Sequence, residues 1–166
     1  MANKQSFTPE EWTTLLESPM IAGMAVSAAE PSGLWGALKE AFASSSALVA
    51  AKTDAGANEL VKAVVADFET SQGRSEIQDA LRKRFEGAKP ADVVQRSLSS
   101  LGEVSRLLDA KAPNDAAAFK GWLRGISQKV AEASKEGGFL GFGGVQVTDA
   151  EKATLADITK TLGVMV

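Results

Sequence analysis

Apolar residues recur every three or four positions along almost the whole chain, and this spacing places them on one face of an α-helix. The pattern is clearest in the segment that Pro113 opens, where the apolar positions are Phe119, Trp122, Leu123, Ile126, Val130 and Ala133. We do not find the alternation of apolar and polar residues that marks a half-buried strand. Residues 144–147 form at most a short extended piece, for which the sequence offers no partner strand. The sequence therefore predicts an all-α fold.

Two helix starts carry a capping box, in which a threonine side chain caps the helix and a glutamate three residues later reaches back to it. The boxes are Thr8-Pro9-Glu10-Glu11 near the start of the chain and Thr148-Asp149-Ala150-Glu151 near its end. Phe7, just before the first box, is placed to pack on Trp12 as a hydrophobic staple. Gly163 is expected to close the last helix.

Prolines and glycines divide the remaining pattern into segments. Pro19 is expected to interrupt the first helix or to start a second one, and a further helix is expected over residues 34–52. Gly73 is expected to separate a helix over residues 60–68 from a charged helix that follows, and Pro90 is expected to start another. No period of 20 to 50 residues recurs, so a solenoid is not expected. We predict a compact single-domain bundle of about six to eight helices covering residues 1–166.

The composition excludes most familiar active sites. The chain has no histidine, no cysteine and no tyrosine, so it lacks the usual general base, the thiolate nucleophile and the phenolic acid. The same absences exclude structural zinc, iron–sulfur and Glu-x-x-His diiron sites, and no segment resembles an EF-hand loop. We therefore expect no metal, no cofactor and no enzymatic activity. An enzyme built on this chain would have to use carboxylates, lysine or serine.

Charge and hydropathy limit the partners. A net charge of -3 and a pI near 5.1 give no electrostatic reason to expect nucleic acid as a partner. The most apolar run, residues 19–29, is too short to cross a bilayer, and the first residues lack the apolar core of a signal peptide. We expect a cytoplasmic protein.

Residues 137–144 form a glycine-rich segment, in which five of the fifteen glycines are interspersed with three large apolar residues. It matches neither a P-loop nor the Gly-x-Gly-x-x-Gly pattern of dinucleotide-binding proteins. In the reading that we favour, the large side chains fold back as plugs into the end of the bundle. In the alternative they form an exposed tip that docks on a partner protein, a membrane surface or a second subunit. The candidate binding residues are Gly137, Gly138, Phe139, Leu140, Gly141, Phe142, Gly143 and Gly144.

Two other features favour ordinary structural roles. The basic run Arg82-Lys83-Arg84 is interleaved with acidic residues, which is typical of a solvated helix face. The three tryptophans, Trp12, Trp35 and Trp122, lie on apolar stripes, so we expect them to pack in the core or at an interface.

Residues 130–145, which read VAEASKEGGFLGFGGV, and the capping box at residues 148–151 resemble the C-terminal signature of a set of small all-helical bacterial proteins of uncharacterised function. Residues 7–12 resemble the opening of the same proteins. This resemblance implies a prokaryotic source and a helical domain, and it brings no activity. The chain is also similar, to a lesser degree, to the helical domain of tellurite-resistance and J-domain-like bacterial proteins. It has Gly143-Gly144-Val145 where those proteins have an acidic Asp-Gly turn, so the resemblance implies no acidic metal site.

These observations favour a non-enzymatic interaction or scaffold protein that self-associates as a homo-oligomer or binds a protein partner not identified by the sequence. The alternative is a small-ligand or lipid-headgroup binding protein whose site lies at the glycine-rich loop, residues 137–144.

Overall fold

The computed structural model describes residues 1–29, 57–136 and 147–165 of the chain. Within these ranges it has six α-helices, one short 3-10 helix and no strand, which confirms the predicted all-α bundle. The elements are η1 (Lys4–Ser6), α1 (Pro9–Ala28), α4 (Glu59–Phe68), α5 (Ser71–Phe85), α6 (Pro90–Lys111), α7 (Pro113–Glu136) and α8 (Asp149–Leu162). The helix predicted over residues 34–52 and Trp35 lie outside the described ranges.

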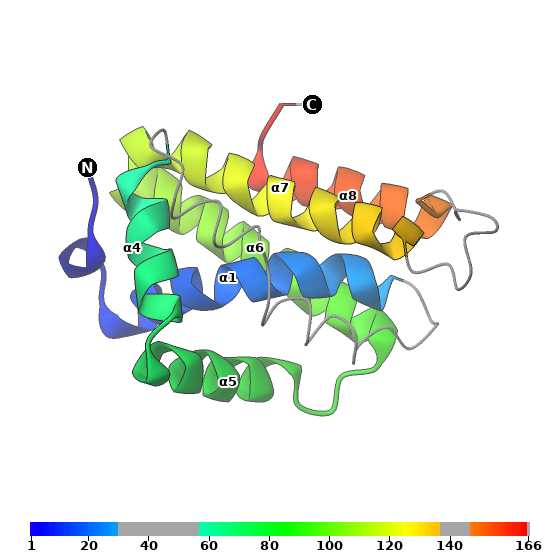
Figure 1. Cartoon of the computed structure of the whole chain (residues 1–166), viewed down its shortest axis with the longest axis horizontal. Coiled ribbons are helices and arrows are strands. Elements are labelled where there is room, and N and C mark those ends of the chain that lie inside the picture. The colour runs from blue at the N-terminus through cyan, green and yellow to red at the C-terminus, as the bar shows by residue number, and fades with distance from the viewer. Residues whose placement is uncertain (30–56, 137–146, 166) are drawn as a thin grey trace.

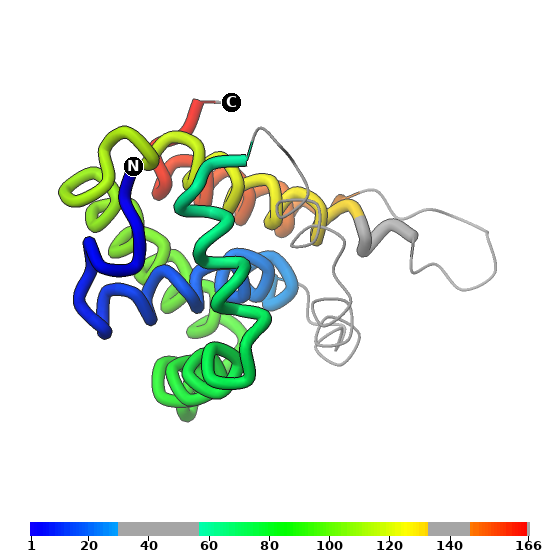
Figure 2. The backbone as a smooth tube through the Cα atoms, turned by 60° about the vertical axis from the view of Figure 1, so that its left-hand side comes forward, coloured from blue at the N-terminus to red at the C-terminus, as the bar shows by residue number. Residues whose placement is uncertain are grey.

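The helix α1 is the centre of the bundle and contacts each of the other five. It runs antiparallel to α6, because Lys111 at the end of α6 pairs with Glu11 in the first turn of α1 at 2.6 Å. Figure 1 shows α7 and α8 along one side of α1 and α5 along the opposite side, with α4 crossing steeply at one end. The view in Figure 2 again shows α7 and α8 lying alongside each other.

The first helix begins where its capping box predicts. The side chain of Thr8 accepts a hydrogen bond from the backbone of Glu11, and the Glu11 carboxylate accepts one from the backbone N–H of Thr8 at 2.8 Å. The rings of Phe7 and Trp12 lie 6.0 Å apart between centroids, as a hydrophobic staple requires. The second capping box is confirmed in the same way at Thr148, and Gly163 closes α8 in the left-handed conformation, with φ of 67°.

The predicted break at Pro19 is wrong, because α1 continues through this residue to Ala28. A proline inside a helix leaves the carbonyl four residues earlier without a backbone donor. Here the Ser18 hydroxyl donates to that carbonyl, the backbone oxygen of Leu15, at 2.7 Å. The Ser18 side chain therefore replaces the missing backbone hydrogen bond, and the helix continues past Pro19.

The predicted role of Gly73 is also wrong, because Gly73 lies inside α5 and not between two helices. The chain turns at Thr70, whose side chain caps α5 by accepting a 2.8 Å hydrogen bond from the Gly73 backbone N–H. A Cβ atom at position 73 would lie 2.0 Å from the backbone oxygen of Asp67. Glycine is required there by the close approach of α4 and α5.

The core extends from α1 across α4, α6, α7 and α8. The stripe predicted for α7 is confirmed at Phe119, Leu123 and Ile126, which are buried. Trp122 lies at the edge of this core, partly exposed, with its ring against Phe119 at 5.3 Å and 77°. The other helices contribute fully buried side chains, including Leu15, Leu16, Ile21, Leu60, Leu101, Leu108, Ile158 and Leu162.

Candidate functional site

All eight candidate residues of the glycine-rich segment lie outside the described ranges. The segment follows α7, which ends at Glu136, and precedes α8, which begins at Asp149. Both of its predicted roles, the plug and the docking tip, stay predictions. The two helices on either side of the segment, α7 and α8, are described.

A half-open groove of about 380 Å³ lies between α7 and α8. This volume falls at the lower end of the range for small-molecule sites. The two helices run antiparallel (Figure 1), and Arg124 near the middle of α7 contacts Thr159 near the end of α8. The groove is lined by Arg124, Gln128, Ala131, Glu132, Val147, Lys152, Leu155, Ala156 and Thr159.

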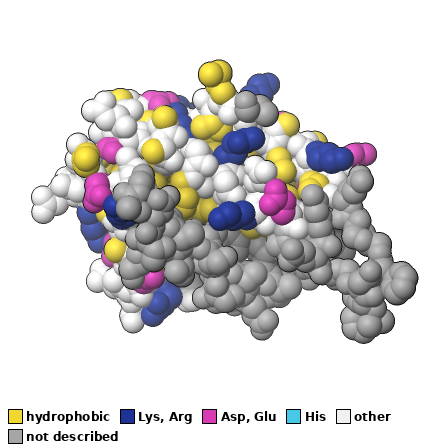
Figure 3. Space-filling view, turned by 45° about the horizontal axis from the view of Figure 1, so that its top comes forward, with side chains coloured by type: hydrophobic (Ala, Val, Ile, Leu, Met, Phe, Trp, Pro, Cys, Tyr) yellow, Lys and Arg dark blue, Asp and Glu magenta, His cyan; other side chains and the backbone are white. Residues whose placement is uncertain are grey.

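Four of the residues that line the groove are apolar. Its apolar lining consists of Leu155, Val147 and the two small residues Ala131 and Ala156. Alanines on facing helices leave space that larger side chains would fill, so the groove exists because these positions are small. Figure 3 shows hydrophobic side chains between separate Lys and Arg side chains on this side of the molecule. An apolar surface with a few fixed polar groups is the usual composition of a ligand site.

One end of the groove is defined by Arg124. Its Nε donates to the Thr159 hydroxyl at 3.3 Å, and that hydroxyl donates in turn to the backbone oxygen of Leu155 at 2.8 Å. The contact orients the guanidinium group. Arg124 lines the groove, and no carboxylate in the described parts of the chain forms an ion pair with it.

The other end of the groove carries charges of both signs. The Gln128 side chain donates to Glu132 at 3.1 Å, and Lys152 pairs with the exposed carboxylate of Asp149 at 3.7 Å. The charges at this end largely balance, whereas the Arg124 end is positive. The groove is therefore polarised along its length.

Apart from the groove, a cluster of charged side chains inside the bundle connects α5 to α1. Arg84 donates to the carboxylate of Glu17 at 2.5 Å, and Glu17 is only 1% exposed. A weaker contact of 3.5 Å joins Arg84 to Glu103 on α6. Burial raises the pKa of Glu17, and the charge and hydrogen bond of Arg84 offset this only in part. The expectation of a solvated face at Arg82-Lys83-Arg84 is thus wrong for Arg84.

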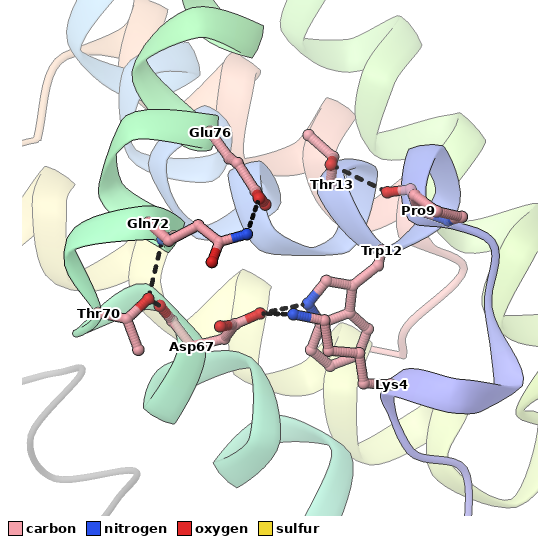
Figure 4. Close-up of polar contacts among 9 residues, drawn as sticks. Lys4, Pro9, Trp12, Thr13, Asp67, Thr70, Gln72 and Glu76 are labelled. Carbon is pink, nitrogen blue, oxygen red and sulfur yellow. Dashed lines mark hydrogen bonds and ion pairs between the residues drawn. The ribbon is translucent and has the colours of Figure 1, made fainter.

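A third group of polar contacts ties the N-terminal segment to α4 (Figure 4). Lys4 from η1 and the indole N–H of Trp12 from α1 both donate to the same carboxylate oxygen of Asp67, each at 2.7 Å. Burial tends to raise the pKa of Asp67, but these two hydrogen bonds and the charge of Lys4 outweigh it, and the pKa is lowered. Figure 4 shows the two donors pointing toward Asp67.

Asp115 at the start of α7 also binds the N-terminal segment. It accepts hydrogen bonds from the backbone N–H of Ala2 at 2.8 Å and from the side chain of Asn58 at 2.7 Å. Burial alone would raise the pKa of Asp115, yet these bonds and the nearby N-terminal charge lower it. Asp67 and Asp115 therefore hold the N-terminal segment in place, and neither lines the groove.

The sequence did not single out the groove residues. Arg124, Gln128 and Glu132 follow a helical spacing on the polar side of α7, and Ala131 lies at the border of the core. Their spacing does not show which helix packs beside them. Glu17 did carry a signal, since it directly follows two leucines in an apolar run. Its partner is 67 residues away in the sequence, and only the packing of α5 on α1 identifies it.

Comparison of the chain with protein-family models, with curated proteins and with solved structures finds no match. The resemblances to bacterial helical proteins stay predictions. In the part of the chain that the structure describes, no three Asp or Glu side chains gather closely enough to hold a metal ion. None of the helices in those ranges combines the length and the hydropathy needed to cross a membrane.

Proposed function

We propose that this chain is a non-enzymatic binding protein and that the groove between α7 and α8 is its binding site. The observation that carries the proposal is the combination of an apolar groove of about 380 Å³ with a guanidinium group held in place at one end. A concave apolar surface with few, well-oriented polar groups is the usual form of a ligand site.

The distribution of perturbed carboxyl groups also supports binding over catalysis. Active sites often contain ionisable groups with shifted pKa values in a cleft. In the described ranges the shifted groups are Glu11, Glu17, Asp67 and Asp115, and each has a structural partner outside the groove. The pKa of Glu11 is lowered by the hydrogen bond from Lys111 and by the helix cap, and burial raises the pKa of Glu17. The shifts at Asp67 and Asp115 accompany the anchoring of the N-terminal segment.

The proposal is tested by filling the groove. Ala156 and Ala153 are both exposed on α8, but only Ala156 lines the groove. A panel of small amphipathic molecules, comprising carboxylates, amines and neutral compounds, is tested for binding by nuclear magnetic resonance. We expect compounds that bind the unmodified protein to shift the resonances of groove residues. The same compounds should not bind the Ala156→Trp variant and should still bind the Ala153→Trp variant.

Two results would overturn the proposal: an absence of binders in the whole panel, or binders that tolerate Ala156→Trp. Sedimentation of the same samples addresses the predicted self-association separately. The protein could form a homo-oligomer that Ala156→Trp dissociates and yet bind no member of the panel. That result would show that the groove is a subunit interface and not a ligand site.

A further inference from the structure

We infer that the groove between α7 and α8 selects a small amphipathic carboxylate, with the carboxylate on Arg124 and the apolar body over Leu155, Ala131 and Val147. This inference rests on the proposed binding function and specifies its ligand class. The Nε of Arg124 is already engaged by Thr159 at 3.3 Å, which leaves the edge formed by the two terminal nitrogens for an incoming group.

That edge suits one kind of anion. Two parallel N–H groups of a guanidinium match the two oxygens of a carboxylate and form a bidentate pair. The hydrogen bond to Thr159 fixes the group before the ligand arrives, so less side-chain freedom is lost on binding. Arg124 is also partly buried at the groove, where water screens its charge less than it would on an open surface.

The length of the groove sets the size of the ligand body. Thr159 and Lys152 both line it and are seven residues apart on α8, which corresponds to a rise of about 10 Å. Between them lies the apolar lining of Leu155 and Ala156. A short alkyl chain or a single aromatic body fits this length.

The charges at the far end argue against a ligand with two anionic groups. Glu132 lines that end, and the carboxylate of Asp149 lies 3.7 Å from the Lys152 amine. A second anion there would meet two carboxylates as well as the lysine. The polarity of the groove therefore favours one anionic head at Arg124 and a neutral or apolar tail.

The test compares octanoate with octanamide, which has the same apolar chain and no charge. We expect octanoate to bind at least about tenfold more tightly than octanamide to the unmodified protein. The variant Arg124→Gln should reduce the octanoate affinity to that of octanamide and leave octanamide unchanged. The matched control Lys129→Gln removes one positive charge from an exposed position of α7 that does not line the groove, and it should leave both affinities unchanged.

Two further variants keep the test independent of the folding of Arg124→Gln. Arg124→Lys retains the charge but cannot form the bidentate pair, so it should lose most of the preference for octanoate. Thr159→Val retains Arg124 and removes the group that orients it, so it should weaken octanoate and spare octanamide.

The inference fails if octanamide binds the unmodified protein as tightly as octanoate, or if Arg124→Gln and Arg124→Lys both keep the preference. It also fails if vesicles of anionic phospholipid bind in an Arg124-dependent manner while octanoate does not, because the ligand would then be a lipid headgroup. In each of these cases the proposed function stands if Ala156→Trp still abolishes binding. If Ala156→Trp retains full binding of octanoate, the proposed function fails as well.

Discussion

The side-chain hydroxyl of Ser18 donates a hydrogen bond of 2.7 Å to the backbone carbonyl oxygen of Leu15 in the middle of α1. Both residues are fully buried. In an uninterrupted helix this oxygen would accept from the backbone N–H of residue 19, but Pro19 has none. The serine thus allows the central helix of the bundle to pass through a proline.

We predict that Ser18→Ala destabilises the protein by about 1–3 kcal/mol, because it leaves a buried carbonyl oxygen without a donor. Chemical denaturation at neutral pH measures the loss. In the Pro19→Ala background, residue 19 regains an N–H that can reach Leu15, so Ser18→Ala should cost much less there. An equal cost in both backgrounds would show that Ser18 acts through something other than the proline.

The buried pair of Glu17 and Arg84 leads to a prediction about pH. The pKa of Glu17 is raised above its ordinary 4.5, so the folded protein binds more protons than the unfolded chain between 4.5 and the raised pKa. This contribution makes the free energy of unfolding fall as pH rises through that window and recover as pH is lowered. We therefore expect Glu17→Gln to flatten the dependence of stability on pH above 4.5.

A second variant separates the ion pair from simple burial of the glutamate. Arg84→Met leaves Glu17 buried without its partner and should destabilise the protein at neutral pH by about 3–5 kcal/mol. Arg82→Met, at an exposed neighbouring position of α5, is the matched control and should have little effect. A pH profile that is the same for Glu17→Gln and for the unmodified protein would contradict the raised pKa.

The helix ends were the part of the fold that the sequence predicted best, because they depend on local chemistry. Thr8 and Thr148 form their capping hydrogen bonds within four residues, so the pattern that predicts them contains all the participants. Gly163 is similar, since its left-handed conformation ends α8 locally.

The wrong predictions at Pro19 and Gly73 share one cause. Each prediction rests on the usual local effect of the residue, which is to interrupt or separate helices. In the structure a neighbouring group changes that effect. At Pro19 the neighbour is the hydroxyl of Ser18, and at Gly73 it is the backbone oxygen of Asp67 in α4. The groove could not be predicted from local patterns. It depends on which faces of α7 and α8 meet, and packing between distant segments decides that.

Gly73 can be compared directly with a glycine that has free space. Alanine at position 73 would place its Cβ 2.0 Å from a backbone oxygen, so Gly73→Ala should destabilise the protein by about 1–3 kcal/mol through forced movement of α4 against α5. At Gly121, in the exposed face of α7, a Cβ would meet nothing within 4 Å. Gly121→Ala should therefore stabilise the protein by about 0.5–1 kcal/mol, because alanine loses less conformational freedom in a helix. Thermal melts of the two variants measure both effects, and a loss of stability in Gly121→Ala would contradict the account.

The last prediction concerns acid and the contact between Asp67 and the Trp12 indole. The pKa of Asp67 is lowered below its ordinary 3.8, so its contribution to stability is present above 3.8 and is lost as pH falls through the lowered pKa. A melt would mix this effect with those of Glu11 and Asp115, whose pKa values are also lowered. The indole N–H of Trp12 is a local probe, because it donates directly to Asp67 at 2.7 Å.

We expect the Trp12 indole resonance to titrate with a midpoint below 3.8, as measured by nuclear magnetic resonance, while resonances of the core remain those of the folded protein. In Asp67→Asn the same resonance should be independent of pH over this range. The Lys4→Met variant should move the midpoint upward, because it removes both the charge and one of the two hydrogen bonds that favour the ionised carboxylate. A midpoint at or above 3.8 in the unmodified protein would show that burial outweighs Lys4 and Trp12, and that Asp67 holds the N-terminal segment less firmly than its contacts indicate.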